Sequence, residues 1–279
     1  MLWRGRSGSS NVEDRRNSPV RGFVAGGGIL GLIIYLLSVY LGGDSTQISF
    51  PQMEGENRQL TEAQQANEDT LADFVSVVLA ETEVAWTEIF RQNRMIYVKP
   101  TLVLFRNRVE SGCGIAGASS GPFYCPEDQR LYIDLAFYEE LHNRFNASGD
   151  FAMAYVIAHE VGHHVQNLLG MTAKVERLRH QLSEKNYNHY SVRLELQADY
   201  YAGVWAHYAD KQNHIVENGD IEEALRAATA VGDDNIQKMT KGYVVPESFT
   251  HGTSEQRKHW FYEGYSRGDL QHGNLFERF

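Results

Sequence analysis

The sequence predicts an α+β domain, mainly helical with a small β-sheet, behind one N-terminal transmembrane helix. Three observations lead to this prediction. Residues 22–43 form an apolar run without charge, residues 101–105 and 130–138 are rich in branched and aromatic side chains, and helical hydrophobic periodicity covers much of the rest. Hydrophobic residues make up 42% of the 279 residues, which is enough to build a core.

The run at 22–43 determines the expected topology. As a helix it spans about 33 Å, close to the ~30 Å thickness of the hydrocarbon layer. A buried core helix and a cleaved signal peptide are the alternatives, but no small-residue cleavage site follows Leu41. Arginines precede the run and acidic residues follow it, so we expect an uncleaved signal anchor. Residues 1–21 would then lie in the cytoplasm and the domain outside.

The remaining elements follow in order along the chain. Residues 44–68 are polar and predict a tether, which leaves residues 69–279 as the domain. A helix with capping-box-like spacing at Thr70 precedes the first strand candidate, and a Gly/Ser-rich loop separates the two strand candidates. Apolar periodicity predicts further helices at about 136–145, 151–169, 191–210, 220–238 and 253–266.

Composition restricts the partners and the compartment. The net charge is −10 and the 26 basic residues form no stripe, which argues against nucleic acid as a partner. Outside the cytoplasm, a disulfide between Cys113 and Cys125 is favoured over two buried thiols. Two cysteines are too few for a structural zinc site of their own.

Residues 159–163, HEVGH, predict a metal site. On a helix His159 and His163 are four residues apart and share a face, so both imidazoles can reach one ion. Glu160 lies beside them, where its carboxylate can accept a proton from a water molecule acidified by zinc. An amphipathic helix that happens to contain histidines is the alternative, since the motif alone is short.

A catalytic zinc needs a third protein ligand and one open position. A third histidine six residues after His163 is excluded, because that position holds Leu169. The segment RLELQADYYAG instead offers Glu195 and Asp199, four residues apart on an apolar helix where unpaired carboxylates would be costly. Glu195 could bind the ion, and Asp199 could accept the second N–H of a ligand histidine. Two acids on a solvated helix face remain the alternative.

These motifs resemble the gluzincin metallopeptidases and, more closely, the bacterial neutral zinc metallopeptidase family. The similar stretches cover nearly the whole chain: NVEDRR (11–16), GPFYCPEDQRLYIDL (121–135), FAMAYVIAHEVGHHVQNLLG (151–170), SVRLELQAD (191–199) and SFTHGTSEQRKHWFYEGY (248–265). The resemblance implies a zincin-like fold and one zinc ion held by His159, His163 and Glu195, with Glu160 as the base. The sequence departs from the most compact gluzincins in the 31 residues between His163 and Glu195.

His251 and Arg257 are further candidates for the site. They resemble an H-P-x-x-x-x-R segment of related membrane metalloproteases, although Gly252 stands where those have proline. A His or Arg donor would stabilise the oxyanion formed on a peptide carbonyl, whereas a loop-tying role is the alternative for His251. By analogy with this class of proteases, an edge strand in FYCPEDQRLYIDL would bind the substrate backbone.

The functional hypothesis is a zinc endopeptidase that acts on protein or peptide substrates. With the predicted anchor, it would be a single-pass protein of the bacterial inner membrane with an extracytoplasmic domain. The alternatives are a binding or scaffold protein with a closed metal site, a zinc hydrolase of non-peptide amides, and a protein whose metal site stays empty in the cell.

Overall fold

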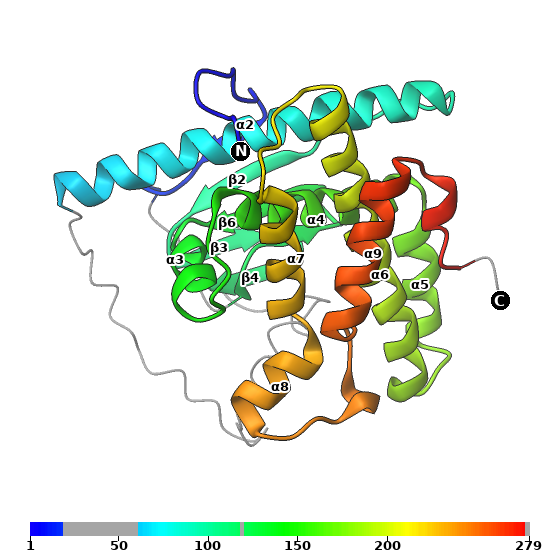
Figure 1. Ribbon diagram of the computed structural model, residues 1–279. Coiled ribbons are helices and arrows are strands. Elements are labelled where there is room, and N and C mark those ends of the chain that lie inside the picture. Colours follow the sequence, from blue (N-terminus) through cyan, green and yellow to red (C-terminus); the bar gives the residue numbers. More distant parts are fainter. Residues whose placement is uncertain (19–60, 118–119, 277–279) are drawn as a thin grey trace.

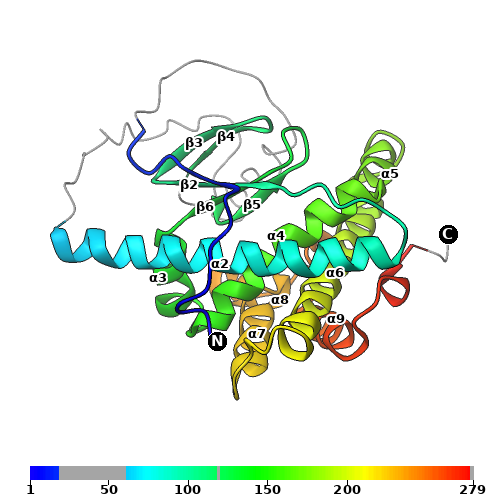
Figure 2. The same cartoon turned by 90° about the horizontal axis from the view of Figure 1, so that it is seen from above.

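A four-stranded sheet covered by helices on one face and by a hairpin on the other forms the centre of the protein (Figures 1 and 2). The computed structural model describes residues 1–18, 61–117 and 120–276. The sheet order is β1-β2-β6-β5, and the second sheet is the β3–β4 hairpin. The strands are β1 (Val12–Asp14), β2 (Thr101–Phe105), β3 (Arg108–Ser111), β4 (Gly114–Gly117), β5 (Phe123–Cys125) and β6 (Arg130–Asp134).

Alternating side chains give the central sheet two buried faces. Leu102 and Leu104 on β2 point to the helical core, whereas Val103 and Phe105 join the smaller core under the hairpin. β1, β2 and β6 run parallel, and β5 pairs antiparallel with β6 at the edge. A disulfide between Cys113 and Cys125 connects the hairpin turn to β5. The edge strand is therefore tied to the sheet on one side and to the hairpin by a covalent bond.

Helices form most of the domain. They are α2 (Glu62–Gln92), α3 (Ala136–Asn143), α4 (Asp150–Leu168), α5 (Met171–Arg179), α6 (Glu184–Lys211), α7 (Asp220–Ala230), α8 (Asp233–Lys241) and α9 (Ser254–Arg267), with 3-10 turns η2 (Pro246–Ser248) and η3 (Gln271–Gly273). α4 lies in the middle of this layer and is buried almost all round. In Figure 1, α6 and α9 lie side by side, and α8 lies at the opposite end of the molecule from α2.

Several predicted boundaries differ from the observed ones. α2 begins eight residues before Thr70, because Thr61 and Gln64 form the capping box. The predicted helix 220–238 is two helices broken at Gly232, which lies so close to Ser254 that a Cβ would be 2.4 Å from its nitrogen. α5 and the start of α6 occupy a stretch for which no helix was predicted, and β3 and β4 lie partly in the expected loop.

The structure is α+β and mainly helical, as predicted. The prediction of a transmembrane helix is not supported and is corrected here. Among the described residues, no helix combines the length and the apolar character that crossing a bilayer requires. The expected span at 22–43 lies outside the described residues.

The predicted topology is also wrong. β1 at residues 12–14 pairs with β2, the Trp3 indole donates to Asp150 (2.9 Å), and Arg6 donates to Glu81 (2.9 Å). The N-terminal segment is thus part of the same folded domain. It cannot lie in the cytoplasm while the domain lies across the inner membrane, so the predicted localisation is not carried further.

Candidate metal centre

A close crossing of two helices creates the site. Gly162, inside the HEVGH sequence, faces α6, and a Cβ there would come within 2.8 Å of the Ala198 carbonyl oxygen. Because glycine has no side chain, the α4 and α6 backbones can approach each other at this point. Ala198 lies between Glu195 and Asp199, so the crossing brings both acids of α6 next to both histidines of α4.

His159, His163 and Glu195 converge on one point. His159 Nε2 lies 3.2 Å from Glu195 Oε2, and His163 Nε2 lies 3.5 Å from Glu195 Oε1. One ligand atom from each residue lies within 4.8 Å of the others. In a tetrahedral zinc site with bonds of about 2.1 Å, neighbouring ligand atoms are about 3.4 Å apart. The two N–O separations agree with that value, so these three residues fit a zinc ion.

Hydrogen bonds at the other ring nitrogen orient both histidines. His159 Nδ1 donates to Asp199 Oδ1 at 2.8 Å, and His163 Nδ1 donates to Gln166 Oε1 at 2.9 Å. With the proton on Nδ1, each Nε2 presents its lone pair to the common point. Gln166 is held in turn by its donation to the Leu194 carbonyl (2.6 Å).

Asp199 is a buried acceptor for three side chains. It is fully buried and accepts from the Tyr155 hydroxyl at 2.5 Å, from His159, and from Arg257 through Nε (2.8 Å) and Nη2 (2.9 Å). Burial alone would raise the pKa of Asp199, but Arg257 and His159 outweigh it and lower the pKa. Asp199 is therefore ionised and holds the His159 ring in place.

Arg257 is in contact with the His159 ring. Its side chain is 5% exposed, and its two donors to Asp199 form a bidentate pair. Nη2 also lies 3.2 Å from His159 Nδ1 and 3.4 Å from His159 Nε2, so the guanidinium packs against the imidazole ring. This geometry makes Arg257 a partner of Asp199. The oxyanion role expected for Arg257 from the sequence stays a prediction.

Glu160 lies next to the ligand cluster without belonging to it. The backbone N–H of Tyr124 on β5 donates to its carboxylate, so the side chain points toward the edge strand. Burial raises the pKa of Glu160, and the neighbouring charges of His163 and His159 act in the opposite direction. A carboxylate with a raised pKa is well suited to accept a proton and return it.

His251 reaches the site from the segment between α8 and α9, and Asp233 fixes its position. One oxygen of Asp233 accepts the backbone N–H groups of Thr250 (2.9 Å), His251 (2.7 Å) and Gly252 (3.0 Å). Its other oxygen lies 3.3 Å from His251 Nδ1. Burial lowers the pKa of His251, but the charges of Glu195 and Asp233 outweigh it and raise the pKa. Asp233 thus holds His251 close to Glu195, where its ring can donate a hydrogen bond.

The edge strand is attached to α4 beside the motif. The Tyr124 hydroxyl on β5 donates to His164 Nδ1 (3.0 Å) and accepts from Asn167 Nδ2 (3.0 Å). His164 Nε2 donates to the Val98 carbonyl (2.6 Å), so this histidine is a buried connector between strand, helix and loop. β5 is the last strand in the sheet order, so within the part of the chain that the structure describes only its edge with β6 is paired.

Some contributors to the site were not predicted from the sequence. Tyr155 and Gln166 could have been predicted from spacing, since they lie four residues before His159 and three residues after His163 on the same helix. No spacing in the sequence predicts the role of Asp233, because it is 18 residues from His251 and its contact depends on how α8 packs.

Comparison with known proteins agrees with this geometry. Residues 1–276 match the family described as "Putative neutral zinc metallopeptidase". The chain belongs to this family. The resemblance predicted from the sequence is therefore confirmed, and membership in this metallopeptidase family implies a zinc cofactor and a peptide substrate at the family level.

Relatives of the chain occur in Escherichia coli and in Mycobacterium tuberculosis. The chain is 46% identical over 285 residues to "Uncharacterized protein YpfJ" of Escherichia coli (strain K12), which covers 99% of both chains. It is also 46% identical over 183 residues to "Uncharacterized protein Rv2575" of Mycobacterium tuberculosis (strain ATCC 25618 / H37Rv), which covers 62% of this chain and 61% of that relative. No solved structure matches the chain.

Proposed function

We propose that this protein is a zinc-dependent endopeptidase. The observation that carries the proposal is the convergence of His159, His163 and Glu195 beside a buried Glu160. Within the described ranges the cluster supplies three ligands, the number found in catalytic zinc sites, whereas structural sites use four. That count favours an enzyme over a closed structural site in a scaffold protein.

The residues around the site have distinct roles in the proposed reaction. When bound, a zinc ion supplies Lewis acidity that polarises a peptide carbonyl and lowers the pKa of a water molecule. Glu160 takes the proton from that water and passes it to the nitrogen of the leaving amine. His251 donates a hydrogen bond to the carbonyl oxygen as negative charge develops there.

A peptide rather than a small amide is the proposed substrate because of β5. Among the described strands only β6 pairs with β5, so an extended peptide can add to the other edge of β5 as a further strand, with backbone hydrogen bonds that do not depend on sequence. The contact between the Tyr124 N–H and Glu160 brings this edge next to the base. A bound peptide would then pass the base and the metal position in one extended conformation.

The test is Glu160→Gln. We expect the variant to retain one zinc per chain, measured by mass spectrometry of the purified protein, and to lose cleavage of a casein-like substrate by at least about 100-fold. Glu139→Gln on α3 is exposed and serves as the control, with parental activity expected. Cleavage by Glu160→Gln at the parental rate would refute the assignment of the base. Cleavage of small amides but not of proteins would favour the amidohydrolase alternative.

A further inference from the structure

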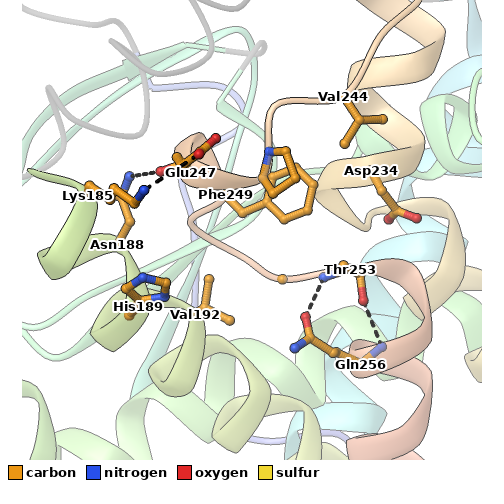
Figure 3. Close-up of a pocket in the computed structure, with 12 residues that line it drawn as sticks. Lys185, Asn188, His189, Val192, Asp234, Val244, Glu247, Phe249, Thr253 and Gln256 are labelled. Carbon is orange, nitrogen blue, oxygen red and sulfur yellow. Dashed lines mark hydrogen bonds and ion pairs between the residues drawn. The ribbon is translucent and has the colours of Figure 1, made fainter.

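A pocket of about 390 Å³ opens between α6, α8 and the segment that leads into α9 (Figure 3). Its walls come from α6, from the turn around η2 and from the start of α9. The residues on these walls that matter most for its chemistry are Val192, Val244, Pro246, Phe249 and Gly252. The volume lies within the range of ~300–1,000 Å³ typical of ligand sites.

The polar groups at the pocket wall are largely paired with one another. Asn188 Nδ2 donates to the Glu247 carbonyl (3.1 Å), and Lys185 Nζ lies 3.5 Å from Glu247 Oε1. Thr253 and Gln256 satisfy each other in the capping box of α9, as the dashed lines in Figure 3 show. The groups left to contact an occupant are therefore mainly apolar, which favours an apolar guest.

Two walls of the pocket belong to the same segments that carry Glu195 and His251. Asn188 and Val192 precede Glu195 by seven and three residues, so the three lie on one face of α6. The opposite wall carries Phe249 and Gly252 on either side of His251. Gly252 packs onto α6 next to the ligand, because a Cβ there would lie 3.3 Å from Val192 Cγ1.

α8 holds the outer wall in a fixed conformation. Gln237 accepts from the Val245 N–H (2.6 Å) and donates to Ser248 Oγ (3.0 Å). Asp233 binds the backbone around His251, and Asp234 accepts from the N–H and the hydroxyl of Ser254 (both 2.7 Å). The wall is thus bound at its beginning, middle and end, and the pocket exists before a substrate arrives.

We propose that this pocket is the subsite for a large apolar side chain of the peptide, adjacent to the bond that is cleaved. The inference rests on the proposed endopeptidase function and adds its substrate class. An apolar cavity of ~150 Å³ already accommodates benzene, so the pocket has room for an aromatic or long aliphatic side chain. Endopeptidase cleavage should therefore occur next to such residues.

The size of residue 192 tests the proposal. Val192→Phe reduces the space and should lower kcat/KM for peptides with Trp or Leu at one fixed position by about 10-fold or more, while Ala peptides are affected less. Val192→Ala should shift the preference toward larger residues at the same position. Val84→Phe is the matched control, since Val84 is 58% exposed on α2. Cleavage sites are read by mass spectrometry of a peptide library.

A binding measurement separates this inference from the proposed function. Blocked peptides that differ only as Ala, Leu or Trp at that position are titrated calorimetrically against zinc-loaded protein with Glu160→Gln, with and without Val192→Phe. If Val192→Phe, but not Val84→Phe, abolishes the preference for Leu and Trp peptides, the subsite is supported. This holds even if the protein cleaves no peptide, because absence of cleavage would refute only the endopeptidase function. An unchanged preference in the Val192→Phe protein overturns the subsite.

Discussion

Replacing Asp199 by Asn tests whether the buried pair behind His159 organises the metal centre. Asp199 is fully buried and the Arg257 side chain is 5% exposed, so the substitution leaves a positive charge in the interior without its counterion. Breaking a buried ion pair in this way costs about 3–5 kcal/mol. Because a domain's free energy of unfolding is about 5–15 kcal/mol, the loss should be a large fraction of the total.

Urea unfolding of the metal-free protein, followed by circular dichroism, measures this cost. Glu263→Gln removes a partly exposed partner of Arg267 and should change the free energy of unfolding by less than about 1 kcal/mol. If Asp199→Asn is too unstable to purify, combining it with Arg257→Met removes the isolated charge and should recover part of the lost stability. A cost for Asp199→Asn as small as that of Glu263→Gln would refute the reasoning.

The same substitution should weaken zinc binding. An amide cannot hold His159 in the tautomer that leaves Nε2 free as firmly as a carboxylate does, so we expect zinc affinity to fall about 10–100-fold. Competition with a chromophoric chelator measures it. Unchanged affinity in a folded Asp199→Asn protein would show that the orientation of His159 does not depend on Asp199.

Three further predictions concern stability. Burial raises the pKa of Asp234, but hydrogen bonds from Ser254 outweigh it and lower the pKa, so its contribution is present above about pH 4 and is lost as the pH falls through the lowered pKa. In urea unfolding, Asp234→Asn should differ from the parent at pH 7, and the difference should shrink as the pH falls below about 4. Cys113→Ser removes a disulfide that closes a short loop and should lower the free energy of unfolding by about 2–3 kcal/mol under oxidising conditions. Equal unfolding free energies for the variant and the parent under those conditions would exclude a contribution from the bond. Gly203→Ala places a Cβ 2.0 Å from a carbonyl oxygen of α9 and should lower the melting temperature by several degrees relative to Gly117→Ala, which meets only an atom at 3.6 Å.

The N-terminal part shows how a local pattern can be misinterpreted. Hydropathy and flanking charge predicted that residues 1–21 and the domain lie on opposite sides of a membrane. Both signals describe only the neighbourhood of residues 22–43. The pairing of β1 with β2 joins residues 90 positions apart, and no local pattern in the sequence reports such a contact.

The sequence alone predicted the candidate ligand set, because helical geometry makes spacing informative. HEVGH places two imidazoles on one face of α4, and E-x-x-x-D places two carboxylates on one face of α6, wherever those helices lie. The tertiary structure alone decided the environment of these groups. It placed Arg257 against His159, Asp233 under His251 and the apolar pocket beside Val192, since each depends on how separate helices pack. Packing is a property of the folded chain as a whole, and no short segment of the sequence encodes it.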